Sequence, residues 1–453
     1  MTTGTVHLSR RQLLAAASVA TAGAAGFGVA TMWPRTHAAT QAAEGDGTDG
    51  WASPLGSARG LAAHLLRRTG FSYTAGELDQ AAALPYTQLV EQVLAQQPDS
   101  LPAVGDPTNH VDVVRSWYGH MATTGAQYPE RMTLFWHGVL TSDFRKAARL
   151  PLVLQQNQLY RTLGRSDLRT LLLATTFDPL MMRYLDSAAS SAAKPNENYS
   201  RELMELFTLG PGNYTETDVR EGARIFSGIR ARRGADGAYA GVLVPRLHDS
   251  GVKTYLGHTG NIGPEQAIDI LLAQPACATH IAQRALVQFC TPAPSPALVN
   301  DVATQFRNAR YDVTALMRAI VTSHDFAAAS AYRSLVRQPA DHMVATMRAL
   351  GRPDLATACV RAGAGMGQAL YDMPTVAGWP PNQAWISSSA LLARINFAWH
   401  AIATHDRLPD SGAALQTLLD GVASDATRSA LNAARSESQR WYALLASPEF
   451  QLK

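Results

Sequence analysis

Apolar residues recur along most of the chain at the three- and four-residue spacing of an amphipathic α-helix. Proline or glycine ends many of these runs, as expected for successive helices joined by short turns. The spacing changes only between residues 229 and 257, where glycines separate short alternating stretches at 239–244 and 252–256. The pattern predicts a mainly α-helical fold: a large multi-helix globular domain with one small β-hairpin or ribbon insertion around 229–257.

The most complete single element lies at residues 194–210, KPNENYSRELMELFTLG. Asn196 suits an N-cap and Gly210 suits the position just after a helix, so we expect one helix between them. Glu202 falls at the edge of its apolar stripe, which consists of Tyr199, Leu203 and Leu206. One hypothesis is a structural helix whose other face carries the salt bridges Glu197–Arg201–Glu205. The other is that Glu202, together with Glu205, lines a polar site.

A second polar group lies at residues 248–254, HDSGVKT, where the β region ends. His248, Asp249 and Lys253 bring together a base, a carboxylate and an amine. The only other lysines are at positions 146, 194 and 453, so Lys253 is a candidate for a site that needs a compact ammonium group. The alternative is a surface turn with a solvated lysine.

His137 lies in the stretch 130–140, which is apolar on two sides and is therefore predicted to be interior. A histidine there is either a satisfied core residue or a ligand or base that needs carboxylates from elsewhere. The chain has no HExxH, paired ExxH, GxSxG, phosphate-loop or dinucleotide-binding pattern. The candidate catalytic residues are His137, Glu202, Glu205, His248, Asp249 and Lys253. His137, Glu202 and His248 are also the candidates for a divalent metal, which no motif indicates, so the cofactor is unknown.

The N-terminus carries a targeting pattern. Arg10 and Arg11 form a twin-arginine pair ahead of a mildly apolar stretch, and small residues near position 38 suit a cleavage point. We expect a twin-arginine signal peptide at 1–38, a flexible linker at 39–54 and a single large helical domain at 55–453. The protein would then be exported to the envelope, the periplasm or the medium, with the twin-arginine translocase as its partner during export. An uncleaved membrane anchor is the alternative, which the glycines of this stretch disfavour.

Charge and cysteine content restrict the partners further. The formal net charge is +3, and residues 1–38 contribute three arginines and no acid, so the mature chain is close to neutral. That balance argues against a nucleic-acid partner, and we expect no stable membrane span in the mature protein. The three cysteines lack zinc-type spacing, so a cysteine metal site is not expected.

Five motifs occur in a fixed order: ERMTLFWH at 130–137, PNENYSRELMELFTLGPGNY at 195–214, HDSGVKT at 248–254, the stretch 366–385, and LLARINFA at 391–398. Together they resemble the bacterial exported family known as domain of unknown function 1800 (DUF1800). The resemblance covers about residues 58–450 and implies an exported, largely helical protein without an established reaction. Family members often occur near genes for an exported, sulfatase-like family, which makes an exported protein partner conceivable. Ile229 and Gly138 depart from the residues common in the family.

Two functions are compatible with these residues. The first is an extracytoplasmic enzyme, hydrolase-like and metal-assisted, with a polar site on the helix at 196–210. The second is a non-catalytic envelope scaffold or binding protein, in which the same residues form a structural polar network. The first hypothesis requires His137, Glu202 and His248 to lie within hydrogen-bond reach, directly or through one water.

Overall fold

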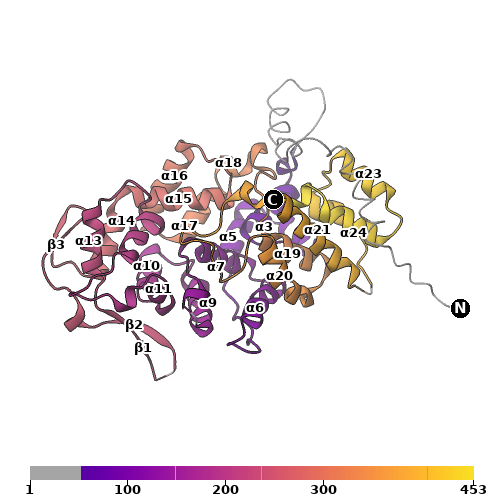
Figure 1. The fold of residues 1–453 in the computed structure, drawn as a ribbon. Helices are drawn as coiled ribbons and strands as arrows, with labels where there is room; N and C mark the ends of the chain where they lie inside the picture. Colours follow the sequence, from indigo (N-terminus) through magenta and orange to yellow (C-terminus); the bar gives the residue numbers. More distant parts are fainter. Residues whose placement is uncertain (1–52, 148, 236, 406) are drawn as a thin grey trace.

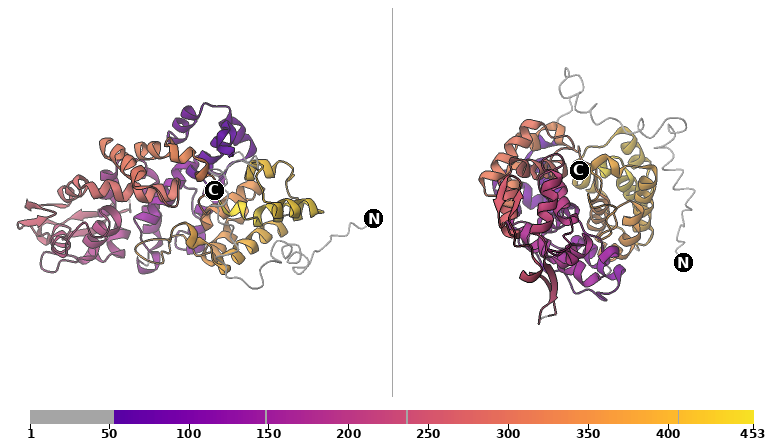
Figure 2. Two further views of the ribbon diagram at one scale, coloured as in Figure 1. Left: turned by 90° about the horizontal axis from the view of Figure 1, so that it is seen from above. Right: turned by 60° about the vertical axis from the view of Figure 1, so that its left-hand side comes forward.

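The structure is a computed structural model that describes residues 53–453, except 148, 236 and 406. The twin-arginine pair, the predicted signal peptide and nearly all of the predicted linker lie outside the described residues. The described chain forms an elongated body made almost entirely of helices (Figure 1). Seen from above, the first helices stand out from the middle of its long axis (Figure 2).

The helices of the described chain can be followed in three successive sections. The first section contains α3 (Ala58–Thr69), α4 (Ala75–Ala82), α5 (Tyr86–Leu94), α6 (His110–Thr123), α7 (Gln127–Val139), α8 (Phe144–Ala147) and α9 (Leu150–Leu163). The second contains α10 (Leu168–Thr176), α11 (Pro179–Tyr184), α12 (Asn198–Glu202), α13 (Glu216–Ile225), α14 (Pro264–Ala273), α15 (Pro275–Phe289), α16 (Pro296–Asn308), α17 (Val313–Val321) and α18 (His324–Ala327). The third contains α19 (Pro339–Leu350), α20 (Ala356–Gly365), α21 (Ser388–Ala403), α22 (Ala414–Leu419), α23 (Asp425–Ala433) and α24 (Glu437–Ala446).

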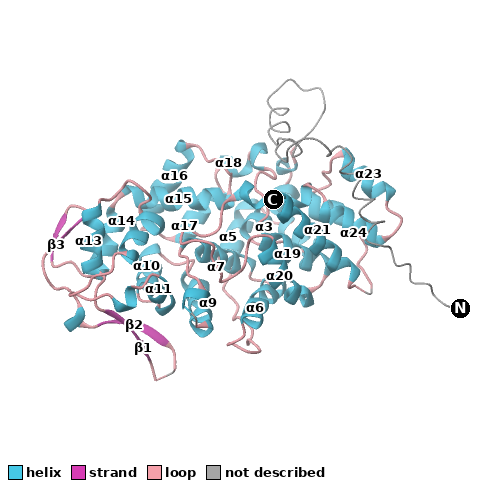
Figure 3. Ribbon diagram, viewed as in Figure 1, coloured by secondary structure: helices cyan, strands magenta, loops and turns pink. Residues whose placement is uncertain are grey.

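Strands of the described chain occur in the predicted region and extend three residues beyond it, to Gly260 (Figure 3). They form two antiparallel pairs: β1 (Ile229–Arg233) with β2 (Tyr239–Leu243), and β3 (Lys253–Tyr255) with β4 (His258–Gly260). The mainly α-helical fold with a small β insertion is therefore confirmed. The insertion consists of two separate ribbons, because the short helical turn Pro245–Leu247 separates β2 from β3.

Two hydrophobic clusters share the core, and α7 lies between them. Met132, Phe135 and Trp136 pack into the first cluster, with the helices of the second section. Leu134 packs into the second cluster, with α6 and the helices of the third section. Figure 1 accordingly shows α7 in the middle of the body, which confirms the prediction of an interior helix. The prediction of one domain at 55–453 stays a prediction.

The charged residues at the start of α7 pair inside this core. Glu130 accepts hydrogen bonds from Arg161 of α9, with Nη2 at 3.0 Å, and from the indole of Trp117, with Nε1 at 2.8 Å. Next to it, Arg131 forms an ion pair with Asp341 of α19. The Lys453 ammonium lies 2.7 Å from the same Asp341 carboxylate. These pairs tie α7 to α6, α9, α19 and the C-terminal residue.

The helix predicted between Asn196 and Gly210 is wrong in its details. The regular helix α12 is only five residues long and passes directly into a π-helix, Leu203–Thr208. Gly210 takes the left-handed conformation expected after a helix end, with φ of 80°. Leu206 lies in the last turn of this helix, where backbone carbonyls have no N–H partner within the helix. π-Helical turns often occur at functional sites. Here two side chains of α15 bind the Leu206 carbonyl: His280 Nε2 at 3.0 Å and Arg284 Nη1 at 3.1 Å.

Candidate functional site

His137 is a neutral residue of the core. Its Nε2 accepts a hydrogen bond from the backbone N–H of Tyr371 at 3.2 Å. Its ring packs at a steep angle against those of Trp117, Tyr371 and Trp379. Burial lowers the pKa of His137 to about 3. Nε2 is therefore already engaged by a backbone N–H inside an aromatic environment, and the structural alternative for His137 is the better supported one.

Glu202 and Glu205 lie half-buried where α12 meets the π-helix. Burial raises the pKa of Glu202, and the neighbouring charge of Glu205 raises it further. Glu205 accepts a hydrogen bond from the hydroxyl of Tyr214. The predicted bridge from Arg201 to Glu205 is therefore wrong, because Arg201 pairs with Glu216 at 2.7 Å and with Glu197 at 3.3 Å.

The polar turn at 248–254 is held by its own contacts. His248 Nδ1 lies 3.0 Å from the Ser227 carbonyl oxygen, and Asp249 forms an ion pair with Arg224 at 2.7 Å. The alternative of a solvated lysine is wrong, since Lys253 is only 1% exposed. Its ammonium donates to the Gly251 carbonyl oxygen at 3.0 Å, and burial lowers its pKa.

The structure places these candidates in three separate environments. Within the described part of the chain, no hydrogen bond or ion pair joins His137, the Glu202–Glu205 pair and the 248–253 turn to one another. No group of three or more His, Cys, Asp or Glu side chains among the described residues is placed to hold a metal ion. In the part of the chain that the structure describes, every candidate except Glu202 has a hydrogen-bond or ion-pair partner of its own in its own environment.

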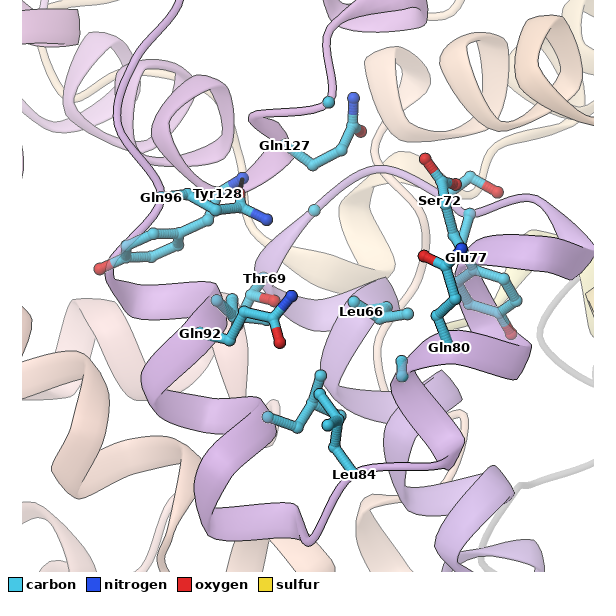
Figure 4. A pocket seen from close by; sticks show the side chains of 16 residues that line it. Leu66, Thr69, Ser72, Glu77, Gln80, Leu84, Gln92, Gln96, Gln127 and Tyr128 are labelled. Atoms are coloured by element: carbon cyan, nitrogen blue, oxygen red, sulfur yellow. Dashed lines mark hydrogen bonds between the residues drawn. The ribbon is translucent and has the colours of Figure 1, made fainter.

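A pocket of about 430 Å³ lies elsewhere, between α3, α4, α5 and the start of α7. Figure 4 shows the side chains around it, which include Leu66 and Thr69 of α3, Glu77 and Gln80 of α4, and Gln92 of α5. Glu77 caps its own helix and also accepts two hydrogen bonds from Arg348 of α19, both at 2.7 Å. Its charge is thereby neutralised, and the wall is dominated by carboxamides and aliphatic groups.

The four carboxamides of the pocket divide into two fixed and two free groups. Gln127 donates to the carbonyl oxygens of Met121 and Thr124, and Gln96 accepts from the backbone N–H of Tyr128 at 3.0 Å. Gln80 and Gln92 are exposed, and their side chains make no hydrogen bond to another described residue. The fixed amides shape the wall, while the free ones are available to a ligand.

Sequence reasoning missed this pocket and did not single out Glu130 or Arg131. One local signal existed, since Gln92 and Gln96 are four positions apart and share a helix face next to Leu89 and Val93. Nothing local indicates that α3 and α4 complete the wall. The ion pair of Arg131 with Asp341 joins residues more than a hundred positions apart, and no short sequence pattern can reveal such a contact.

Fold and site together define a mainly helical protein with ion pairs inside its core and an uncharged polar pocket at its side. No described helix is long and apolar enough to cross a membrane. A family model described as "Protein of unknown function (DUF1800)" matches residues 64–452. The chain belongs to this family, which confirms the resemblance found in the motifs. Comparisons with curated proteins and with solved structures gave no match.

Proposed function

We propose that this protein is an exported binding protein of the cell envelope and that the pocket between α3, α4, α5 and α7 is its binding site. The observation that carries the proposal is the pair of free carboxamides, Gln80 and Gln92, set against the aliphatic side chains of the same pocket. Ligand sites commonly combine a concave, partly apolar wall with a few polar groups that fix orientation. This proposal takes up the second of the two functions that the sequence allows.

The hydrolase-like alternative has less support from the geometry. A general base must lie within hydrogen-bond reach of the group that it activates. Glu202 retains a raised pKa at a half-buried position, but no Ser, Cys, Lys or His side chain among the described residues forms a hydrogen bond with it. His137 binds a backbone N–H, and Lys253 binds a backbone carbonyl. We therefore assign His137 and Lys253 to packing.

Export through the twin-arginine route is the second part of the proposal, and it rests on Arg10 and Arg11. Its test is a double Arg10→Lys, Arg11→Lys variant followed by cell fractionation. We expect the variant to accumulate in the cytoplasm, whereas the natural sequence reaches the extracytoplasmic fraction. Export of the variant in undiminished amount would contradict this route.

The pocket can be probed with a single thiol. Gly125 lies on the pocket wall at an exposed position, and a Cβ built there meets nothing within 4 Å, so Gly125→Cys should fold normally. The native Cys277, Cys290 and Cys359 are buried, and burial raises the pKa of each thiol, so they should react slowly. The matched control is Gly76→Cys on α4, which is also exposed and unobstructed but does not line the pocket.

The measurement is the rate at which iodoacetamide alkylates each variant, with and without the dialysable fraction of an envelope extract. We expect the extract to slow alkylation of Gly125→Cys and to leave that of Gly76→Cys unchanged, because only the pocket thiol would be covered by a ligand. Equal rates for Gly125→Cys with and without extract would contradict a binding role for this pocket.

A further inference from the structure

We propose that the ligand of the pocket is an uncharged saccharide of one or two sugar rings. This inference rests on the proposed function, since it names the chemical class of ligand for the same site. It follows from three properties of the wall: its charge, its hydrogen-bonding groups and its apolar surface.

The charge of the wall excludes ionic ligands. Glu77 is the only lining residue with an acidic or basic side chain, apart from the phenols of Tyr73 and Tyr128. Both phenols are neutral, because burial raises their pKa, to about 12 for Tyr73. Arg348 and the helix cap at Thr74 occupy the Glu77 carboxylate, and together they lower its pKa. A phosphate or carboxylate would find no free cation in the wall, and a cationic ligand would find no free anion.

The hydrogen-bonding groups suit hydroxyls. A carboxamide carries a donor and an acceptor side by side, and a sugar hydroxyl can use both at once. Gln80 comes from α4 and Gln92 from α5, and they lie on opposite sides of the hollow in the view of Figure 4. A ring between them can therefore be held at hydroxyls on both of its sides. Thr69 is not counted here, because its hydroxyl already donates to the Leu65 carbonyl oxygen.

The apolar part of the wall suits the C–H face of a sugar ring. Leu66, Leu84 and Val93 lie among the polar groups, so a ligand must present apolar and polar surface in alternation. Sugars do this, whereas a fully apolar ligand would leave Gln80 and Gln92 desolvated without partners. A peptide is disfavoured, because its extended backbone needs an open groove and this hollow is bounded by three helices and the start of α7.

The size of the hollow fits this class. At about 430 Å³ it falls within the range found for small-molecule sites and leaves room for a mono- or disaccharide. A polysaccharide could then enter only by one end.

The test uses the mature chain and calorimetric titration with defined probes. The neutral probes are maltose, cellobiose and N,N′-diacetylchitobiose; the comparison probes are glucose 6-phosphate, glucosamine and a blocked neutral tripeptide. We expect at least one neutral saccharide to bind, and Gln80→Ala and Gln92→Ala each to weaken it about fivefold to tenfold, the loss of one hydrogen bond. The control Gln305→Ala changes an exposed glutamine of α16 and should leave binding unchanged.

The same probes are applied to the alkylation assay on Gly125→Cys, so that two failures can be told apart. Protection by the envelope extract, together with binding of only the charged probes or the tripeptide, would overturn the saccharide while the binding role stands. The saccharide would also be overturned, and the binding role would stand, if the extract protects Gly125→Cys but none of the defined saccharides binds or protects. Saccharide binding that is unchanged in both glutamine variants would overturn the assignment to this pocket. Absence of any protection, by extract or probe, would overturn the proposed function itself.

Discussion

Helix α7 and the neighbouring pocket both gather polar side chains, but with opposite chemistry. At α7 the groups are charged and shielded from solvent, since Glu130, Arg131 and Asp341 are each at most 1% exposed. Arg131 pairs with Asp341, and Glu130 pairs with Arg161. At the pocket the groups are neutral and open to solvent, and Gln80 and Gln92 have no partner among the described residues. The start of α7 borders both regions, because Gln127 and Tyr128 line the pocket just before Glu130.

The difference distinguishes polar groups that stabilise the fold from polar groups that are available to a ligand. A buried charge costs several kcal/mol to desolvate, so it persists only where fixed partners surround it, and such a network leaves nothing for a ligand. An open carboxamide costs little, because water binds it until a ligand replaces the water. The charged residues of the motif ERMTLFWH accordingly serve the fold, while two glutamines outside any of the family motifs form the candidate site.

Removing the charge of Glu130 should have the largest effect. Glu130→Gln leaves Arg161 buried without its full counter-charge, and we expect a loss of about 3–5 kcal/mol in the free energy of unfolding. Urea denaturation measures it. The matched control is Glu91→Gln, which breaks the exposed pair with Arg318 and should cost at most about 1 kcal/mol. Similar losses in both variants would show that the α7 network is not sealed from water.

Acid should weaken the ion pairs of Glu130 and Asp341 and thereby lower the free energy of unfolding. Hydrogen bonds and ion pairs lower the pKa of both Glu130 and Asp341 to about 2, against the burial that would raise it. Their stabilisation is complete above the pKa of the unfolded chain, near 4. It is lost as pH falls from there through about 2. We expect the free energy of unfolding to drop over this window, with a shallower slope in Glu130→Gln. An identical slope in that variant would refute the assignment.

Asp178 should show the reverse pH dependence with a smaller effect. This buried residue caps α11, and burial raises its pKa to about 7. Its ionisation therefore destabilises the fold as pH rises from about 4 to 7. We expect Asp178→Asn to stabilise the protein by about 2 kcal/mol at pH 8 and by much less at pH 4, since asparagine also caps helices.

The control for Asp178→Asn is Asp167→Asn, a partly exposed cap of α10. It should change the free energy of unfolding by less than about 0.5 kcal/mol at either pH. A gain in Asp178→Asn that is equal at pH 4 and pH 8 would mean that charge burial is not its cause.

The smallest effect is expected at Glu202. Because this carboxylate is half-buried and like-charged with Glu205, Glu202→Gln should change the free energy of unfolding by less than about 0.5 kcal/mol at pH 7. Thermal denaturation followed by circular dichroism measures it. A loss above about 2 kcal/mol would place Glu202 in a structural network like that of α7 and blur the distinction between the two regions.

Local order was predictable from the sequence because its causes lie within a few residues. The Ser387 cap of α21 and the Thr215–Asp218 capping box depend on groups three positions apart, and the left-handed turn at Gly210 follows from the residue type itself. The helical period of the apolar residues likewise gave the fold class, and the ordered motifs gave the family. The π-helical geometry of residues 203–208 was not predicted, nor were the contacts of the Leu206 carbonyl with His280 and Arg284, which lie far along the chain.

The sequence by itself thus determined that this chain is mainly helical, belongs to its family and has an interior helix at α7. Only the tertiary structure decided which polar residues are sealed and which are open. Glu130 and Glu202 look alike along the sequence, both on amphipathic helices, yet one is buried with Arg161 and the other is half-exposed. Burial is set by packing between segments that are distant in the sequence. Arg348 of α19, for example, pairs with Glu77 at the pocket, and a local sequence pattern cannot indicate such a contact.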